Sequence, residues 1–425
     1  MRKNILITTG GSGGHVIPAT IIYEHLKDKY NVHLTSDRRG IKFLKKEKYN
    51  IEIIDTPKLS RNIFYLPFQI ILFFNSIIRS FILLKEKKIE IVISTGGYMS
   101  LPLCFASKIL NRKLFLIEPN MVLGRSNKIF IKYCNKIFCY SDKIKNFPDK
   151  YKNKISTIYP LVRKEFYETH KLEKTDEKTN ILIIGGSQGA KLFDTIIHSI
   201  KEISKKYKLK IYQQTNTDNF KQLKDYYSSN TIENEIFDFN ANISDIMNKS
   251  NICITRAGAS TLAELIFMNI PHLAIPLPSS KDNHQFENAN FYKEKDCCWI
   301  LNQLSLEDKI EELLNDILKN QIGQDLFKNN RQSNYATFFN TRKMYIDVDM
   351  NKAAASGLIL ASDSTLTARI PIQLPENKSY LIKDELALLD VITSNINDRP
   401  IYFSVTCRPE KMFGLNPFTR MEGLG

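Results

Sequence analysis

The sequence has few of the features that would place it in the simplest functional classes. Its seven cysteines form no Cys-x-x-Cys pair and no cysteine and histidine spacing that would hold zinc, so we expect reduced thiols and no zinc site. The first residues run directly into a strand pattern and lack a signal-peptide apolar core, which predicts a protein that stays inside the cell. With 43% hydrophobic and 25% charged residues, the 425-residue chain has globular composition and enough length for two or three domains.

What the chain does contain is a pair of glycine-rich turns, residues 10–14 and 185–189, each after an apolar strand pattern and before a helical one. Neither fits a dinucleotide fingerprint, because Val16 stands where the first turn needs its third glycine and the second lacks the spacing. Neither fits a P-loop, since Lys191 is followed by leucine. A dehydrogenase and an ATPase are therefore disfavoured. Backbone N–H groups at such turns face phosphate, so two turns predict two similar domains around a shared cleft.

The order of strand and helix patterns predicts the fold class. Short β-branched runs alternate with longer helical stretches, which favours an α/β protein with two Rossmann-like, doubly wound parallel sheets. The expected strands are 4–8, 32–35, 51–54, 89–94, 113–117, 136–139 and 155–158, then 181–184, 208–213, 236–239, 252–255, 272–275 and 298–301. The expected domains are 1–163 and 180–342, joined by a charged linker at 164–179 and followed by a tail at 343–425.

The charge of the chain is unevenly distributed. The formal net charge is +15, but residues 343–425 carry nine Lys and Arg against ten Asp and Glu, so the basic excess lies before the tail. A positive surface suits an anionic partner such as nucleic acid, acidic lipid or a phosphorylated substrate. The alternative is a Lys-, Ile- and Asn-rich genome bias without a defined patch. The tail replaces that bias with Ala, Leu, Ser and Pro, which indicates an unrelated or appended segment.

The apolar segment 63–84 raises the question of a membrane helix. A spanning helix would bury Arg79 near mid-span at a cost of roughly 2.5 to 3.5 kcal/mol. We therefore expect an amphipathic helix, flanked by Lys85, Lys87 and Lys88, that is partly packed on its domain and partly available to a membrane surface. The alternative is a buried core helix.

Several separate motifs together resemble the MurG family over residues 4–340. They are the blocks at 10–15, 96–98, 118–120, 160–163, 185–190, 256–264, 282–285 and 288–289. This resemblance implies a two-domain GT-B fold with the acceptor domain first and the donor domain second. It also implies an inverting transfer of N-acetylglucosamine from UDP-N-acetylglucosamine to the 4-hydroxyl of lipid-linked N-acetylmuramyl-pentapeptide, on the cytoplasmic face of the bacterial inner membrane. The implied partners are these two substrates and an anionic membrane surface, without nucleic acid or cofactor.

The resemblance also assigns candidate site residues. His15 would be the general base, because a neutral imidazole suits proton removal from the attacking hydroxyl; its alternative is a phosphate-positioning or structural histidine. Glu264 would accept the ribose hydroxyls of uridine. Neither expected domain, 1–163 or 180–342, contains an Asp-x-Asp sequence, so amides and hydroxyls would meet the pyrophosphate without a metal. The full set of expected substrate-binding residues is Ser12, Gly13, Gly14, Asn120, Arg163, Ser187, Gln188, Gly189, Asn240, Arg256, Gly258, Ser260, Thr261, Glu264, Gln285 and Asn288.

Departures from the family pattern keep other functions open. Residues 117–120 read Ile-Glu-Pro-Asn where the family has His-Glu-Gln-Asn, which weakens the expected acceptor positioning more than the expected uridine binding. The likeness ends near Thr341, where a closing helix normally follows, and the tail faintly resembles a soluble C-terminal piece of large bacterial membrane proteins of glycosyltransferase-like type. The alternatives are a UDP-N-acetylglucosamine 2-epimerase of the same fold and a non-catalytic, membrane-bound sugar-nucleotide binding subunit.

Overall fold

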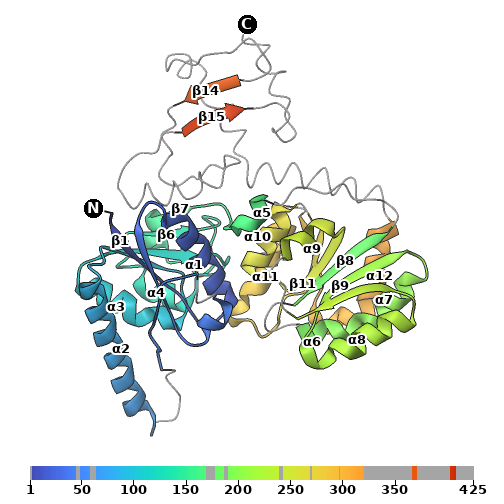
Figure 1. The fold of residues 1–425 in the computed structure, drawn as a ribbon, viewed down its shortest axis with the longest axis horizontal. Helices are drawn as coiled ribbons and strands as arrows, with labels where there is room; N and C mark the ends of the chain where they lie inside the picture. The colour runs from blue at the N-terminus through green and yellow to red at the C-terminus, as the bar shows by residue number, and fades with distance from the viewer. Residues whose placement is uncertain are drawn as a thin grey trace. The chain divides into compact units, whose positions relative to one another are not determined.

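Two parallel sheets organise this computed structural model, one in each of two compact units that divide between Val162 and Arg163 (Figure 1). The structure describes residues 2–44, 48–57, 64–168, 178–185, 190–238, 243–268, 270–295, 297–319, 366–370 and 403–407.

The first unit is built on a seven-stranded sheet with the order β3-β2-β1-β4-β5-β6-β7. Its strands are β1 (Asn4–Thr8), β2 (Asn31–Ser36), β3 (Ile51–Ile53), β4 (Ile91–Ser94), β5 (Lys113–Glu118), β6 (Lys136–Cys139) and β7 (Ile155–Thr157). Its helices are α1 (Gly13–Leu26), α2 (Leu66–Glu86), α3 (Leu101–Ile109) and α4 (Arg125–Phe130). The central strands are buried runs of β-branched and leucine residues, as expected for a parallel sheet covered on both faces.

The second unit repeats the plan with a six-stranded sheet in the order β10-β9-β8-β11-β12-β13. Its strands are β8 (Thr179–Ile184), β9 (Leu209–Gln214), β10 (Glu233–Phe237), β11 (Ile252–Thr255), β12 (His272–Ala274) and β13 (Cys298–Ile300). Its helices are α5 (Lys164–Glu168), α6 (Ala190–Phe193), α7 (Ile197–Ser204), α8 (Thr217–Ser229), α9 (Ile243–Lys249), α10 (Ala259–Phe267), α11 (His284–Lys293) and α12 (Leu306–Lys319).

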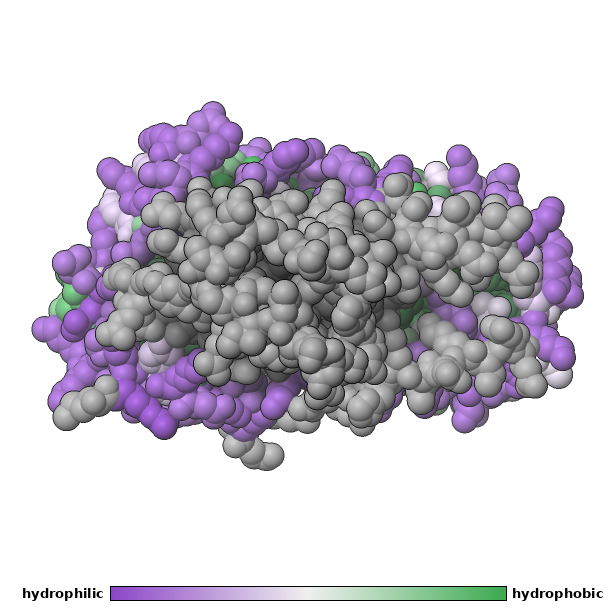
Figure 2. All heavy atoms as spheres, turned by 90° about the horizontal axis from the view of Figure 1, so that it is seen from above, coloured by the Kyte–Doolittle hydropathy of each residue, from purple (hydrophilic) through white to green (hydrophobic). Residues whose placement is uncertain are grey.

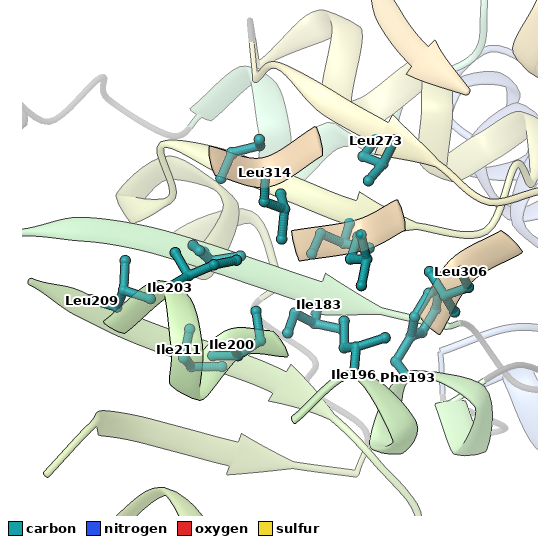
Figure 3. Packing of buried hydrophobic residues seen from close by; sticks show 14 of the residues in the cluster. Ile183, Phe193, Ile196, Ile200, Ile203, Leu209, Ile211, Leu273, Leu306 and Leu314 are labelled. Atoms are coloured by element: carbon teal, nitrogen blue, oxygen red, sulfur yellow. The ribbon is translucent and has the colours of Figure 1, made fainter. Parts of the chain in front are cut away.

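The core of the second unit shows why this sequence forms a helix-covered sheet. Ile183 on β8 and Ile211 on β9 lie among Ile200 of α7 and Leu314 of α12, all of them buried (Figure 3). The strands supply β-branched residues, which suit a pleated surface, and the helices supply apolar residues at helical spacing. Burial of each such side chain contributes about 1.5 to 3 kcal/mol.

The prediction of two doubly wound parallel sheets is confirmed. All thirteen expected strands form, with ends that differ by up to three residues from the predicted ones. The charged stretch after residue 163 begins with the helix α5. This helix belongs to the second unit and packs on α10 through the ring contact of Tyr167 with Phe267. In the tail the structure describes only an antiparallel pair, β14 (Leu366–Ile370) and β15 (Phe403–Cys407).

Candidate functional site

The candidate residues gather at the same topological position in both sheets. In each unit the strand order reverses direction beside the first strand, between β1 and β4 in one sheet and between β8 and β11 in the other. Ligands of open α/β sheets bind beyond the carboxyl ends of the strands at such switch points. His15 follows β1, and Arg256 follows β11 directly. The two switch points are therefore the candidate ligand sites.

In the first unit the imidazole of His15 is held by the end of β4. Its Nδ1 lies 2.8 Å from the carbonyl oxygen of Thr95. Because a carbonyl only accepts, Nδ1 carries the proton in the neutral ring and Nε2 is the basic nitrogen. This tautomer is the one that a general base needs if Nε2 faces the substrate.

Two glycines after β4 form the walls beside that imidazole. Gly96 and Gly97 have φ values of +85° and +82°, a conformation that L side chains rarely adopt. A Cβ on Gly96 would lie 3.4 Å from Cε1 of His15, and one on Gly97 would lie 3.2 Å from Cδ2. The motif at 96–98 therefore leaves just enough room for the ring.

The glycine turn of the first unit is occupied by a carboxylate of the chain itself, which the sequence analysis missed. Asp37, the residue after β2, is buried and accepts hydrogen bonds from the backbone N–H of Gly11 at 2.7 Å and of Gly40 at 2.9 Å. Arg39 contacts the same carboxylate at 2.8 Å. The available signal was the position of Asp37, because an acidic residue after the second strand of a Rossmann-like unit commonly contacts the glycine turn or its ligand.

Asn120 lies after β5 and is held by Glu118. The Asn120 side chain donates from Nδ2 to Glu118 Oε1 at 3.2 Å. Burial raises the pKa of the Glu118 carboxyl, and hydrogen bonds from Gly124, Asn127 and Asn120 oppose that rise. Ser12, Gly13 and Gly14 lie at the start of α1, where Ser12 is the extended N-cap residue. The structure thus brings the expected residues of this unit to one edge of its sheet.

The second unit has a buried cation at its switch point. The Arg256 side chain is 8% exposed, and it donates from Nη1 to the carbonyl oxygen of Ile275 at 3.1 Å and lies over the Phe193 ring. Among the described residues its Nε has no hydrogen-bond partner, and neither does the buried hydroxyl of Ser260 on α10. Burial lowers the pKa of Arg256. Two orphaned polar groups at this end of the strands fit an anionic ligand.

Glu264 is paired with Arg163. Its Oε1 lies 2.7 Å from Arg163 Nε and its Oε2 lies 3.1 Å from Nη2, which is a bidentate contact. Burial raises the pKa of the Glu264 carboxyl, and the Arg163 guanidinium opposes that rise. Glu264 is buried, so it is not a solvated helix-surface glutamate. Each oxygen still has lone pairs for a ribose hydroxyl, so the pairing orders the carboxylate without using all its capacity.

Helix α11 contributes the remaining candidates. Gln285, in its first turn, accepts from the backbone N–H of Leu277 at 2.9 Å. Asn288, one turn later, is 1% exposed and donates to the carbonyl oxygen of Ala257 at 3.2 Å, which ties α11 to the turn that carries Arg256. Asp282 and Asn283 before the helix have φ values of +54° and +56°, a strained conformation that is frequent at ligand sites.

Some expected residues have less structural information. Gly258 is the N-cap residue of α10 and Thr261 lies in its first turn. Ser187, Gln188, Gly189 and Asn240 lie outside the described residues. Within the described ranges, no group of three His, Cys, Asp or Glu side chains is placed to hold a metal ion.

Family models match almost the whole chain. The model of the glycosyltransferase family 28 N-terminal domain matches residues 5–139, and that of the family 28 C-terminal domain matches residues 180–343. A third model, TMEM260-associated domain 2, matches residues 271–425 and so includes the tail.

Individual relatives agree with these matches. The UDP-N-acetylglucosamine--N-acetylmuramyl-(pentapeptide) pyrophosphoryl-undecaprenol N-acetylglucosamine transferase of Pelagibacter ubique is 52% identical over 349 residues, covering 81% of this chain and 98% of that protein. The crystal structure of Acinetobacter baumannii MurG aligns with a TM-score of 0.62 at 22% identity, over 78% of this chain and 95% of that one. A UDP-N-acetylglucosamine 2-epimerase aligns with a TM-score of 0.54 at 11% identity, over 77% and 91%.

Proposed function

Because this chain belongs to glycosyltransferase family 28 and to its MurG-type members, we propose that it transfers N-acetylglucosamine from UDP-N-acetylglucosamine to lipid-linked N-acetylmuramyl-pentapeptide. The observation that carries the proposal is the 52% identity along 98% of a relative with that name. The epimerase likeness, at 11% identity, concerns the fold alone.

The second unit is the proposed donor site. The departing UDP gains negative charge on its pyrophosphate, and preorganised donors aimed at that charge lower the barrier. Arg256 and the Ser260 hydroxyl supply such donors, since both have buried polar atoms without a partner in the described chain. Glu264, ordered by Arg163, accepts the ribose hydroxyls. Gln285 contacts the donor sugar, and Asn288 fixes the turn between them. No metal is required by this arrangement of charges.

The first unit is the proposed acceptor site. The 4-hydroxyl of the muramyl sugar attacks the anomeric carbon, and Nε2 of His15 takes its proton as the carbon–oxygen bond to UDP breaks. Direct attack converts the α linkage of the donor into a β linkage. The Thr95 carbonyl stabilises the imidazolium that forms, because it accepts from Nδ1 in both protonation states.

The helix α2 is the proposed membrane contact. It is long and apolar enough to cross a bilayer by length and composition. Of the 16 large hydrophobic side chains that are exposed in the described chain, nine lie between Phe64 and Ile82. The helix buries a stripe of small polar residues instead, Ser76 and Ser80, before Leu84. The face of the molecule in Figure 2 is, by contrast, mostly hydrophilic where it is described.

This arrangement favours a helix that lies on the membrane. Arg79 is exposed, and Lys85 and Lys88 follow at the helix end, so the apolar side chains meet the acyl region while the cations meet anionic headgroups. The proposed location is the cytoplasmic face of the bacterial inner membrane, where a lipid-linked acceptor is presented. Nucleic acid is not a proposed partner, because both substrates named above are sugar and lipid compounds.

The proposed function is tested by UDP release from UDP-N-acetylglucosamine with and without the lipid-linked acceptor. Transfer predicts release only with the acceptor, formation of a disaccharide product, and undiminished rates with EDTA. Epimerisation predicts UDP-N-acetylmannosamine without acceptor, or N-acetylmannosamine and UDP where water cleaves the sugar–phosphate bond. Tight UDP binding with neither reaction would favour a non-catalytic subunit.

A further inference from the structure

Glu118 is a buried acidic residue for which the chemistry above has no use. It ends β5, its side chain is 2% exposed, and it accepts hydrogen bonds from four N–H groups of three residues. In the described part of the chain no lysine, arginine or histidine forms an ion pair with it. A carboxylate kept in such a place at the cost of desolvation needs a reason.

The two oxygens of Glu118 face different partners. Oε2 accepts from the backbone N–H of Gly124 at 2.7 Å and from Nδ2 of Asn127 at 3.0 Å. Neither donor can turn away: the first is backbone, and the second also donates to the carbonyl oxygen of Ile117 at 3.0 Å. A Cβ on Gly124 would lie only 2.9 Å from Oε2, so this side is also tightly packed.

The other oxygen faces Asn120 and is hydrogen-bonded to both its backbone and its side chain. Oε1 accepts from the Asn120 backbone N–H at 3.3 Å and from its Nδ2 at 3.2 Å. Because the amide is planar, a bond from Nδ2 to Glu118 directs Oδ1 to the opposite side. The reverse orientation would place an amide oxygen against a carboxylate oxygen.

We propose that Glu118 is a positioning residue that fixes the amide of Asn120, so that Asn120 accepts a hydrogen bond from a sugar hydroxyl of the substrate. This inference rests on the proposed function and adds to it the direction of one hydrogen bond. The same carboxylate orders Asn127, whose Nδ2 lies 3.4 Å from the point where a Cβ of Gly96 would stand, on the wall beside His15. Glu118 therefore connects two parts of the first unit's site.

Glu118→Gln is the informative variant, because glutamine has only one acceptor oxygen. Two fixed donors lie on the Gly124 side and one, the Asn120 backbone N–H, on the other, so we expect the oxygen to face Gly124 and the new NH₂ group to face Asn120, with loss of the bond from the Asn120 backbone. The Asn120 amide then rotates to accept with Oδ1 and presents N–H groups to the substrate. We expect kcat/KM to fall about tenfold, as in Asn120→Ala, since each removes one substrate hydrogen bond.

The double variant Glu118→Gln with Asn120→Asp tests the direction of that bond. One oxygen of the new aspartate accepts from Gln at position 118, and the other again accepts from the substrate. We expect kcat/KM to recover to within about threefold of the unmodified protein, although two residues have changed. A role confined to folding predicts no such recovery. Glu90→Gln, at an exposed position before β4, is the matched control.

A measurement without turnover separates this inference from the proposed function. In full-length protein labelled with ¹⁵N-asparagine, the Asn120 side-chain amide, assigned with Asn120→Ala, should exchange its protons at least about tenfold more slowly than exposed Asn75. Slow exchange in a protein that lacks transferase activity would contradict the proposed function but support the orientation of the Asn120 amide. Equal exchange, an unchanged kcat/KM in Asn120→Ala, or a double variant no better than Glu118→Gln would overturn the inference.

Discussion

The residue that follows the second strand of the sheet differs between the two units. In the first it is Asp37, whose carboxylate takes the Gly11 amide of the glycine turn. In the second the corresponding residue after β9 is Thr215, a neutral side chain that donates to Asp194. The first turn therefore has a carboxylate hydrogen-bonded to it, whereas the residue that follows β9 in the second unit is neutral.

The residues that follow the inner strand differ in the same sense. After β4 the first unit offers the Thr95 carbonyl, which holds the His15 imidazole at Nδ1. After β11 the second unit offers the buried guanidinium of Arg256. The ends of these two inner strands thus differ in charge, which fits the proposed roles of proton transfer at a hydroxyl in the first unit and pyrophosphate binding in the second.

The largest effect is expected from removal of the proposed general base of the first unit. We expect His15→Ala to lower turnover by about 10²-fold or more, because general base catalysis typically contributes that much. UDP affinity should stay unchanged, since the donor residues belong to the other unit. The measurements are steady-state turnover and calorimetric titration with UDP, with exposed His198→Ala as the control. Comparable losses of turnover and UDP affinity would make His15 a nucleotide-binding residue.

Removal of the buried cation should have the opposite pattern. Arg256→Met keeps the apolar stem and deletes a charge that lacks a carboxylate partner in the described chain. We expect UDP to bind about 10- to 100-fold more weakly, the range for a charge-assisted hydrogen bond of about 1.5 to 3 kcal/mol. The melting temperature should change little, because the hydrogen bond lost at the Ile275 carbonyl is offset by removal of a buried charge, and no buried ion pair is broken. Arg38→Met, which breaks an exposed ion pair with Asp55, is the control. A lower melting temperature with unchanged UDP affinity would assign Arg256 to the core.

The ion pair of Arg163 with Glu264 allows a second test of the proposed donor site. Glu264→Ala should weaken UDP binding by about 1 to 3 kcal/mol, because a polar contact to the ribose loses one partner. Arg163→Lys keeps the charge but loses the two-pronged geometry, so its effect on UDP affinity should be smaller. Titration with UDP and with 2′-deoxy-UDP measures both. If Glu264→Ala binds the two nucleotides as the unmodified protein does, the carboxylate does not contact the ribose.

The sequence was sufficient for the sheets and for the places of the main candidates, because strand periodicity and glycine turns are local patterns. The sequence was not sufficient to predict which groups the candidate side chains contact. The contact between Arg163 and Glu264 joins residues 101 apart, and that between His15 and the Thr95 carbonyl joins residues 80 apart. A backbone carbonyl has no signature in a sequence. Glu118 stood inside a recognised motif, yet its role depends on neighbours that only the fold brings together.

The helix α2, the proposed membrane contact, offers a smaller effect that should leave both switch points untouched. Phe68→Ser with Ile71→Ser removes two exposed apolar side chains from α2. We expect binding to vesicles with anionic lipid to weaken about tenfold or more, since each substitution removes apolar area that the bilayer would bury. UDP affinity should not change. Asn75→Ser, an exposed polar position on the same helix, is the control. Vesicle binding that persists at full strength would place the membrane contact elsewhere.

The tail should matter least. The family 28 model ends at residue 343, and 81% of this chain already covers 98% of the Pelagibacter relative. A stop after Lys343 should therefore leave UDP affinity and turnover within about twofold of the full chain. A matched stop after Lys319 also removes residues 320–343, which the family model includes, and should lower the melting temperature and turnover together. If the stop after Lys343 lowers the melting temperature and turnover as much as the stop after Lys319 does, the tail supplies part of the fold that the family model attributes to the donor domain. The boundary at 343 would then be misplaced.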